Sequence, residues 1–209
     1  MRALKINGSE VAGFYAYSPS FAGGVNVSAI DAVGDSKKEI LTGPGRGGGP
    51  HVRVFNRNGG EVAGFYAYSP TFTGGIDVAA GDVGGVDNKE EIVTAAGPGG
   101  SAHTRLFTRL GAAIGQGFNS YEAYTGYTGG ARVSVGNVRT STPKSEILVS
   151  PWFAGGPHIR LLDKNGQPVS ENYYYETWWT GYYDVAAGNG FSLVSSGTNR
   201  RSSIRPGPQ

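Results

Sequence analysis

The chain has 209 residues, with 36 glycines, 11 prolines, no cysteine and a formal net charge of +2. The lack of cysteine excludes disulfides, thiolate metal sites and cysteine nucleophiles. The small net charge argues against nucleic-acid binding, which needs a concentrated basic face. No apolar run approaches the roughly 20 residues of a membrane span, and the first residues lack the apolar core of a signal peptide.

Short runs rich in Val, Ile, Tyr and Phe alternate with glycine-rich turns, which predicts many short β-strands and few helices. The strands expected in the N-terminal part, in one complete repeat and in the C-terminal part lie, in chain order, near residues 2–6 and 10–17, then 75–83, 91–95, 103–107 and 115–124, then 182–188 and 191–195.

An internal repeat is the strongest feature of the sequence. Residues 10–19 and 61–70 both read EVAGFYAYSP. The segment GPHVRVF at residues 49–55 recurs in looser form at 101–107 and 156–162. The chain ends in GPQ and begins with MRAL, and joined tail to head these residues match the same segment. We therefore expect one domain, residues 1–209, made of four repeats at about residues 1–51, 52–103, 104–158 and 159–209.

Each repeat offers four strands for one antiparallel sheet, and such a sheet cannot bury both of its faces alone. Radial stacking gives a propeller, whereas linear stacking needs polar end caps, which we do not find. We predict an all-β, four-bladed β-propeller with four-stranded antiparallel blades. The N- and C-terminal half-repeats would share one blade and so close the ring. The alternative is a portion of a longer array, in which two chains pair into an eight-bladed ring.

Four segments of the repeat match a known pattern, namely residues 72–76 (FTGGI), 78–83 (VAAGDV), 91–94 (EIVT) and 43–55 (GPGRGGGPHVRVF). In these segments the chain resembles the FG-GAP/VCBS family of propeller repeats, over essentially its whole length. The resemblance implies β-propeller blades of the kind found in adhesion heads, lectin-like binders and bacterial surface-protein arrays. It also implies an extracellular or cell-surface protein whose signal peptide is not part of this chain, with a cytoplasmic location as the alternative.

The same family often carries a calcium loop, Asp-x-Asp-Gly-Asp-Gly-x-x-Asp, after the first strand. Here residues 31–39 and 82–90 keep two or three acids and add lysines, while residues 137–144 keep none. Calcium takes six to eight oxygen ligands, largely from carboxylates. We therefore predict no family-type calcium, no other metal and no cofactor, with weak binding at Asp82 and Asp87 as the alternative.

Residues that could carry out catalysis are few and scattered. The three histidines, His51, His103 and His158, share one repeat position on three different blades, so we expect a structural role and not a shared zinc ion. The glycine-rich residues 43–49 lack the Gly-Lys-Ser/Thr ending of a phosphate-binding loop. We predict that the protein is not an enzyme, although loops of separate blades can assemble a site, which is the alternative.

Aromatic residues are abundant, with 12 Tyr, 9 Phe and 3 Trp, and they concentrate in the outer strands and the links between repeats. Most should fill the space between blades. The candidates for ligand or partner binding are Trp152, Trp178, Trp179, Tyr17, Tyr68 and Tyr124. We predict a non-enzymatic binding or structural module for protein–protein contact or self-assembly at the cell surface. A lectin that binds carbohydrate on the aromatic-rich loop face is the alternative.

Overall fold

The computed structural model describes residues 1–84, 89–120, 126–178, 180–196 and 204–206. The described residues form β-strands joined by turns, with no helix, so the predicted all-β class is confirmed. Nothing in this described part is a helix long and apolar enough to cross a membrane.

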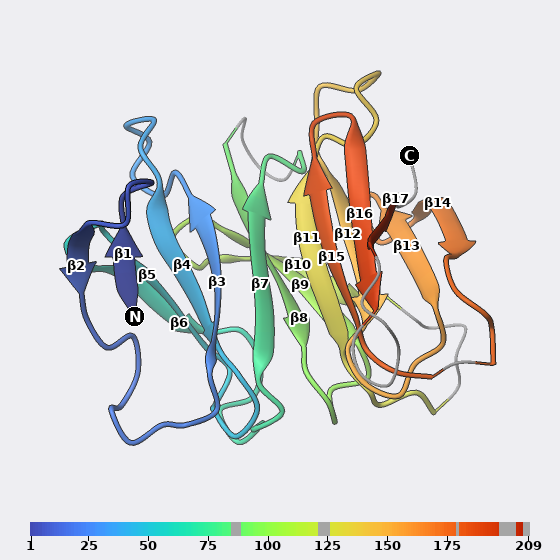
Figure 1. Ribbon diagram of the computed structural model, residues 1–209, viewed down its shortest axis with the longest axis horizontal. Helices are drawn as coiled ribbons and strands as arrows, with labels where there is room; N and C mark the ends of the chain where they lie inside the picture. The colour runs from blue at the N-terminus through green and yellow to red at the C-terminus, as the bar shows by residue number, and fades with distance from the viewer. Residues whose placement is uncertain (85–88, 121–125, 179, 197–203, 207–209) are drawn as a thin grey trace.

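The strands form separate antiparallel sheets (Figure 1). Three sheets are complete, with four consecutive strands each. They are β3 (Val25–Ile30), β4 (Glu39–Pro44), β5 (His51–Phe55) and β6 (Glu61–Tyr66); β7 (Ile76–Gly81), β8 (Glu91–Ala96), β9 (His103–Thr108) and β10 (Ala113–Asn119); and β11 (Ala131–Gly136), β12 (Glu146–Pro151), β13 (His158–Leu162) and β14 (Pro168–Tyr173).

Two incomplete sheets contain the ends of the chain. One has two strands, β1 (Arg2–Leu4) and β2 (Glu10–Gly13). The other has three, β15 (Tyr183–Gly188), β16 (Phe191–Ser196) and β17 (Ile204–Pro206). In Figure 1 the β1–β2 sheet, in blue, lies at the left, and β15–β17, in red, overlap the β11–β14 sheet, whose strands β13 and β14 lie farther right.

The second strand of each complete sheet is an apolar run because both of its faces are covered. Every residue of β8 and β12 is buried, in the sequences EIVTAA and EILVSP. The fourth strands, β6 and β14, have more exposed residues and lie at the sheet edge. Strands covered on both faces read as continuous apolar runs, whereas strands with one solvated face alternate.

The sheets pack face to face in chain order. One buried apolar cluster joins the β3–β6 and β7–β10 sheets, a second joins β7–β10 and β11–β14, and a third joins β11–β14 and the C-terminal sheet. The first strands of successive sheets, β3, β7, β11 and β15, contact one another in this order. In Figure 1 they stand next to each other and point the same way.

The chain ends differ from the expected shared blade. The C-terminal part supplies three strands and not the expected two, because β17 pairs with β16 where β1 was expected. β1 pairs with β2, and among the described residues no pairing joins the two terminal sheets. Other bounds also shift: β2 ends at Gly13 and β10 at Asn119, earlier than the sequence suggested.

Candidate functional site

A polar cluster forms where the first strands of the sheets meet. Its members are the second residues of β3, β7, β11 and β15, and they occupy one position of the repeat: Asn26, Asp77, Arg132 and Asp184. The Arg132 guanidinium lies 3.6 Å from an Asp77 carboxylate oxygen and 3.7 Å from one of Asp184. It also donates a hydrogen bond of 3.2 Å to Asn26 Oδ1. One side chain therefore bridges all four first strands.

Asp77 is the buried member of this cluster. Its carboxylate accepts a 3.0 Å hydrogen bond from the Val133 amide of the next sheet. Burial raises the pKa of Asp77 to about 6, while the nearby Arg132 charge and the Val133 hydrogen bond act in the opposite direction and Asp184 adds to the increase. The carboxylate of Asp184, in contrast, is mostly exposed.

Trp152 belongs to this cluster as well, although it was singled out from sequence as a binding ring. The Arg132 guanidinium carbon lies 4.4 Å from the centre of the Trp152 ring. A cation at this distance over an indole is attracted by the ring's negative face. One face of Trp152 is thus occupied by a side chain of the protein itself.

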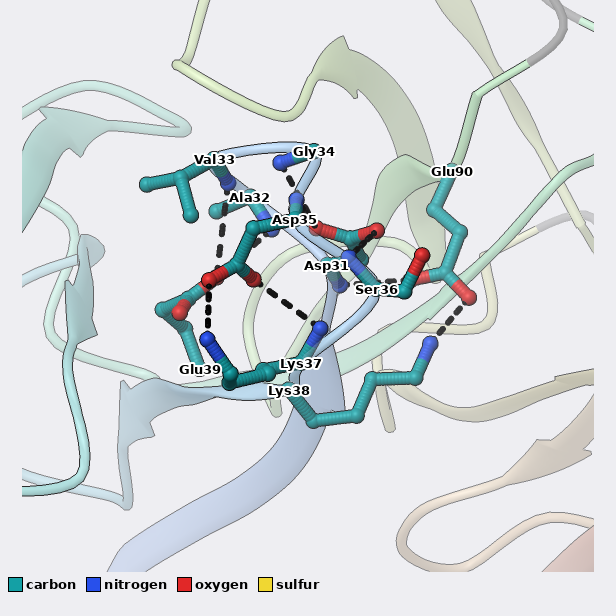
Figure 2. Close-up of polar contacts among 10 residues, drawn as sticks. All are labelled: Asp31, Ala32, Val33, Gly34, Asp35, Ser36, Lys37, Lys38, Glu39 and Glu90. Carbon is teal, nitrogen blue, oxygen red and sulfur yellow. Dashed lines mark hydrogen bonds and ion pairs between the residues drawn. The ribbon is translucent and has the colours of Figure 1, made fainter.

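The opposite end of the sheets carries the loops in which the family resemblance would place calcium, and Figure 2 shows the first of them. Asp31 Oδ1 accepts hydrogen bonds from the amides of Gly34 and Asp35, and Asp31 Oδ2 accepts one from Ser36. Its oxygens are therefore used to close the turn. Glu90, from the next sheet's loop, accepts from the Asp31 amide at 2.7 Å and pairs with Lys38.

A lysine also neutralises the equivalent loop of the second repeat. Lys144 lies 2.7 Å from Asp82, and both oxygens of this carboxylate accept hydrogen bonds from its ammonium group. Lysines thus supply positive charge beside loop acids. Among the described residues no group of three His, Asp or Glu side chains could hold a metal ion. Asp87, named with Asp82 in the calcium alternative, lies outside the described residues.

A polar cleft of about 420 Å³ lies between these loops. Its lining combines acidic and basic side chains with small loop residues: Asp31, Gly34, Ser36, Lys38, Asp82, Lys89, Glu90 and Arg109. The three acids are engaged by backbone amides or lysines as described above. Each carboxylate among the described lining residues therefore accepts a hydrogen bond from a backbone amide or a lysine.

A buried glutamate supports the same loop in each complete repeat. Glu39 accepts hydrogen bonds from the amides of Ala32 and Val33, and Glu146 accepts from those of Val138 and Arg139. Glu91 accepts from the amide of Val83. These carboxylates satisfy buried backbone donors at the end of the first strand, which is a structural role.

Tyr17 and Tyr68, two predicted binding residues, use their hydroxyl groups inside the fold. The Tyr68 hydroxyl lies 2.7 Å from the carbonyl oxygen of His103 and 3.1 Å from the side-chain oxygen of Thr94. The Tyr17 hydroxyl makes the matching contacts with His51 and Thr42. Burial raises the pKa of both hydroxyls. Each tyrosine joins the end of one sheet to the next sheet.

Replacement of Tyr68 by phenylalanine tests this role. We expect Tyr68→Phe to lower the free energy of unfolding by about 1–2 kcal/mol, because a buried hydroxyl and its acceptors lose their hydrogen bonds. Tyr66→Phe is the matched control, since its side chain is 54% exposed, and should change stability by less than about 0.5 kcal/mol. Equal effects in urea titrations of the two variants would contradict the assignment.

The remaining predicted binding residues do not form one site. Trp178 is 75% exposed in the link before β15. Trp179 and Tyr124 lie outside the described residues. Of the described candidates, Tyr17, Tyr68 and Trp152 contact other parts of the fold, and Trp178 has a largely exposed side chain.

The three histidines lie on three separate sheets, on β5, β9 and β13. His51 stacks on Tyr66 with ring centres 4.7 Å apart, and His158 stacks on Tyr173 at 4.6 Å. Burial lowers the pKa of all three imidazoles. These positions support the structural role expected from the repeat.

Sequence reasoning missed the central cluster and strand β17. Asn26, Asp77, Arg132 and Asp184 differ in type, so no residue pattern marked them, although their shared repeat position could have done so. The signal for β17 is the dipeptide Ile204-Arg205, which repeats Val52-Arg53 and Ile159-Arg160.

The chain was compared with known proteins. No family model matches it, so the resemblance to FG-GAP/VCBS repeats stays a prediction. No curated protein matches it either. A solved structure of a protein of unknown function from Bacteroides caccae is similar, with a TM-score of 0.51 and 16% sequence identity. The match covers 96% of this chain and 65% of that protein, so this chain spans about two thirds of its length. At this identity the similarity shows the fold alone.

Proposed function

We propose that this chain is a non-enzymatic binding or structural module of the β-propeller type. In this proposal the sheets are blades around the Arg132 cluster, and the two incomplete sheets contribute to one shared blade. Closure within one chain would give the four-bladed ring expected from sequence. The module serves protein–protein contact or assembly. This contact covers the apolar side chains that are exposed on β1 and β16.

The observation that carries the proposal is the exposure of apolar side chains at the chain ends, at repeat positions that are buried elsewhere. Leu4 of β1 is 58% exposed. The three residues at the same position of complete sheets are at most 3% exposed, and they are Phe55, Phe107 and Leu162. Exposed apolar surface at a fixed place in a fold marks a contact site.

The other end of the chain shows the same difference. Leu193 of β16 is 38% exposed, whereas its equivalents in complete sheets, Leu41, Val93 and Leu148, are fully buried. Both incomplete sheets therefore present apolar surface that the repeat is built to bury. Burial of such area stabilises association by about 25 cal/mol per Å² before the costs of association are counted.

The acidic and histidine side chains that could act in catalysis contact other groups of the fold, which favours a structural role. Asp77 pairs with Arg132, Glu146 holds two backbone amides, and His158 lies against Glu171 and the ring of Tyr173. A catalytic acid or base needs access to the proton that it transfers. These three described side chains already donate or accept hydrogen bonds, or form ion pairs, within the fold.

Thiol labelling tests whether the end surfaces are covered in solution. Because the chain has no cysteine, Leu4→Cys and Tyr15→Cys each give one reactive group. Both side chains are well exposed here, at 58% and 71%. If Leu4 is covered by contact, its labelling should be slower by about tenfold or more, while Tyr15 labels freely. Equal and fast labelling at both positions contradicts the proposal.

A further inference from the structure

Resting on the proposed function, we infer that the side chain of Arg105 binds a carboxylate of the partner protein, presented by an Asp or Glu on the partner's surface. Arg105 lies on β9, the third strand of its sheet. The arginines at the same repeat position, Arg2, Arg53 and Arg160, each hold a carboxylate of this chain. Arg105 keeps the same backbone contact as two of them but lacks the carboxylate.

Arg53 shows how the guanidinium group is used in this repeat. Its Nη1 donates a hydrogen bond to the carbonyl oxygen of Ala16, in the link that precedes the sheet. Its Nε donates to one oxygen of Glu61 at 3.1 Å, and its Nη2 donates to the other oxygen. Arg2 donates to Glu10 from the same two nitrogens. One side of the guanidinium group therefore binds backbone, and the other side binds a carboxylate.

Arg160 repeats this arrangement, and Arg105 repeats only half of it. Arg160 Nη1 donates to the carbonyl oxygen of Ser120, while its Nε donates to Glu171 at 3.0 Å. Arg105 Nη1 donates to the carbonyl oxygen of Ala67 at 2.6 Å. In the described part of the chain no acidic side chain pairs with Arg105. The Nε and Nη2 side of its guanidinium group is therefore open.

The first position that supplies an acid elsewhere is occupied by alanine in this sheet. Glu61 lies opposite Phe55 in the β5–β6 ladder, two residues after Arg53. In the β9–β10 ladder the residue opposite Phe107 is Ala113. Ala113 is exposed. The place that the Glu61 carboxylate takes in one repeat is thus reachable from outside the protein in the next.

The second position that supplies an acid is occupied by a bulge. Glu171 lies directly opposite Arg160 in the β13–β14 ladder. At the matching place in the β9–β10 ladder, residues 115–117 have no partner in the register, and their sequence is GQG. A Cβ on Gly117 would lie 2.8 Å from Cγ of Arg105. Backbone, and not an acidic side chain, therefore lies beside the arginine.

The open side of this guanidinium group favours a carboxylate as its ligand. The planar fork of an arginine matches the two oxygens of a carboxylate, and such pairs are among the stronger hydrogen bonds in proteins. The guanidinium carbon of Arg105 also lies 5.1 Å from the centre of the Phe107 ring. This ring and the Ala67 carbonyl group hold the fork in place, so less side-chain entropy is lost when a ligand binds.

An NMR titration tests the inference, with a hexaglutamate peptide blocked at both ends as the probe. The Nε–H signal of Arg105, identified by its loss in Arg105→Lys, is expected to shift until the site is saturated. The Nε–H signal of Arg53 is the internal control and should stay in place, because that group already donates to Glu61. A hexaglutamine peptide should shift neither signal.

Two glutamate variants show whether the open fork is the binding site. Ala113→Glu places the repeat's own acid beside Arg105 and should weaken peptide binding by about fivefold or more. Ala112→Glu is the matched control, because it adds the same charge one residue before β10 begins, and should change binding by less than about twofold. Both alanines are exposed, so neither substitution disturbs the core.

An Arg105 signal that does not move with hexaglutamate overturns the inference, and so does equal weakening by the two glutamate variants. Binding of an oligoglucuronate but not of the peptide overturns the protein partner and assigns the site to an acidic sugar. Slow labelling of Leu4→Cys without peptide binding overturns the inference alone. Fast labelling of Leu4→Cys with peptide binding at Arg105 removes the proposed contact at β1 and keeps the carboxylate site.

Discussion

Replacement of Glu146 by alanine is expected to lower the free energy of unfolding by about 2–4 kcal/mol, because a buried carboxylate and the hydrogen bonds that it accepts are removed. The carboxylate is 3% exposed and accepts from the amides of Val138 and Arg139. It also accepts from the Thr142 hydroxyl and pairs with the Arg139 side chain at 3.0 Å. Urea titration followed by circular dichroism measures the loss.

Two further variants show whether the loss of stability comes from the buried hydrogen bonds of Glu146 or only from the removal of a negative charge. Glu146→Gln keeps an oxygen acceptor for the amides and should lose about half as much stability as the alanine variant. Glu171→Ala removes a carboxylate that is 47% exposed and pairs with Arg160, and should cost less than about 1 kcal/mol. If Glu146→Ala were no worse than Glu171→Ala, the loop glutamates would not have the role assigned to them.

Replacement of Asp77 by asparagine is expected to change how stability depends on pH. The pKa of Asp77 is about 6 in the folded protein, against 3.8 for an unperturbed carboxyl. The folded state therefore binds the proton more tightly, and stability should fall as pH rises from about 4 to about 6 and then level off. Relative to the wild type, Asp77→Asn should gain about 1–3 kcal/mol between pH 4 and pH 7.

The comparison between the two proteins isolates this one group. The histidines have lowered pKa values, so they remove stability from both proteins as the pH falls below about 6.5, and their effect cancels in the difference. Glu10→Gln is the control, because that carboxylate is 39% exposed and pairs with Arg2, outside the Arg132 cluster. Parallel stability–pH curves for the wild type and Asp77→Asn would contradict a raised pKa at Asp77.

Much of the fold followed from sequence because the repeat fixes the order of strands. Apolar runs such as EIVTAA mark second strands covered on both faces, and the GPHVRVF segments mark third strands. The chain ends were harder to predict. Arg2 and Arg205 both match the arginine of the third strand, and only the three-dimensional arrangement shows that β17 and not β1 pairs with β16.

The candidate site was less accessible to sequence reasoning. Tyr17 and Tyr68 were expected to face a partner, but whether a hydroxyl points outward depends on the neighbouring sheet, which supplies the acceptors. Arg132 replaces the Asn or Asp of the other repeats and so bridges the first strands. A single substitution in a repeat looks like sequence divergence until its contacts with the neighbouring sheets are known.

The measurement that tests the central claim most directly is the molar mass in solution, by light scattering on a size-exclusion column over a wide range of concentrations. Self-assembly of the module predicts a mass of at least twice the 21.8 kDa of one chain, increasing with concentration and reduced by Leu4→Lys, which places a charge on the exposed apolar surface of β1. A mass of 21.8 kDa at every concentration would contradict assembly between copies.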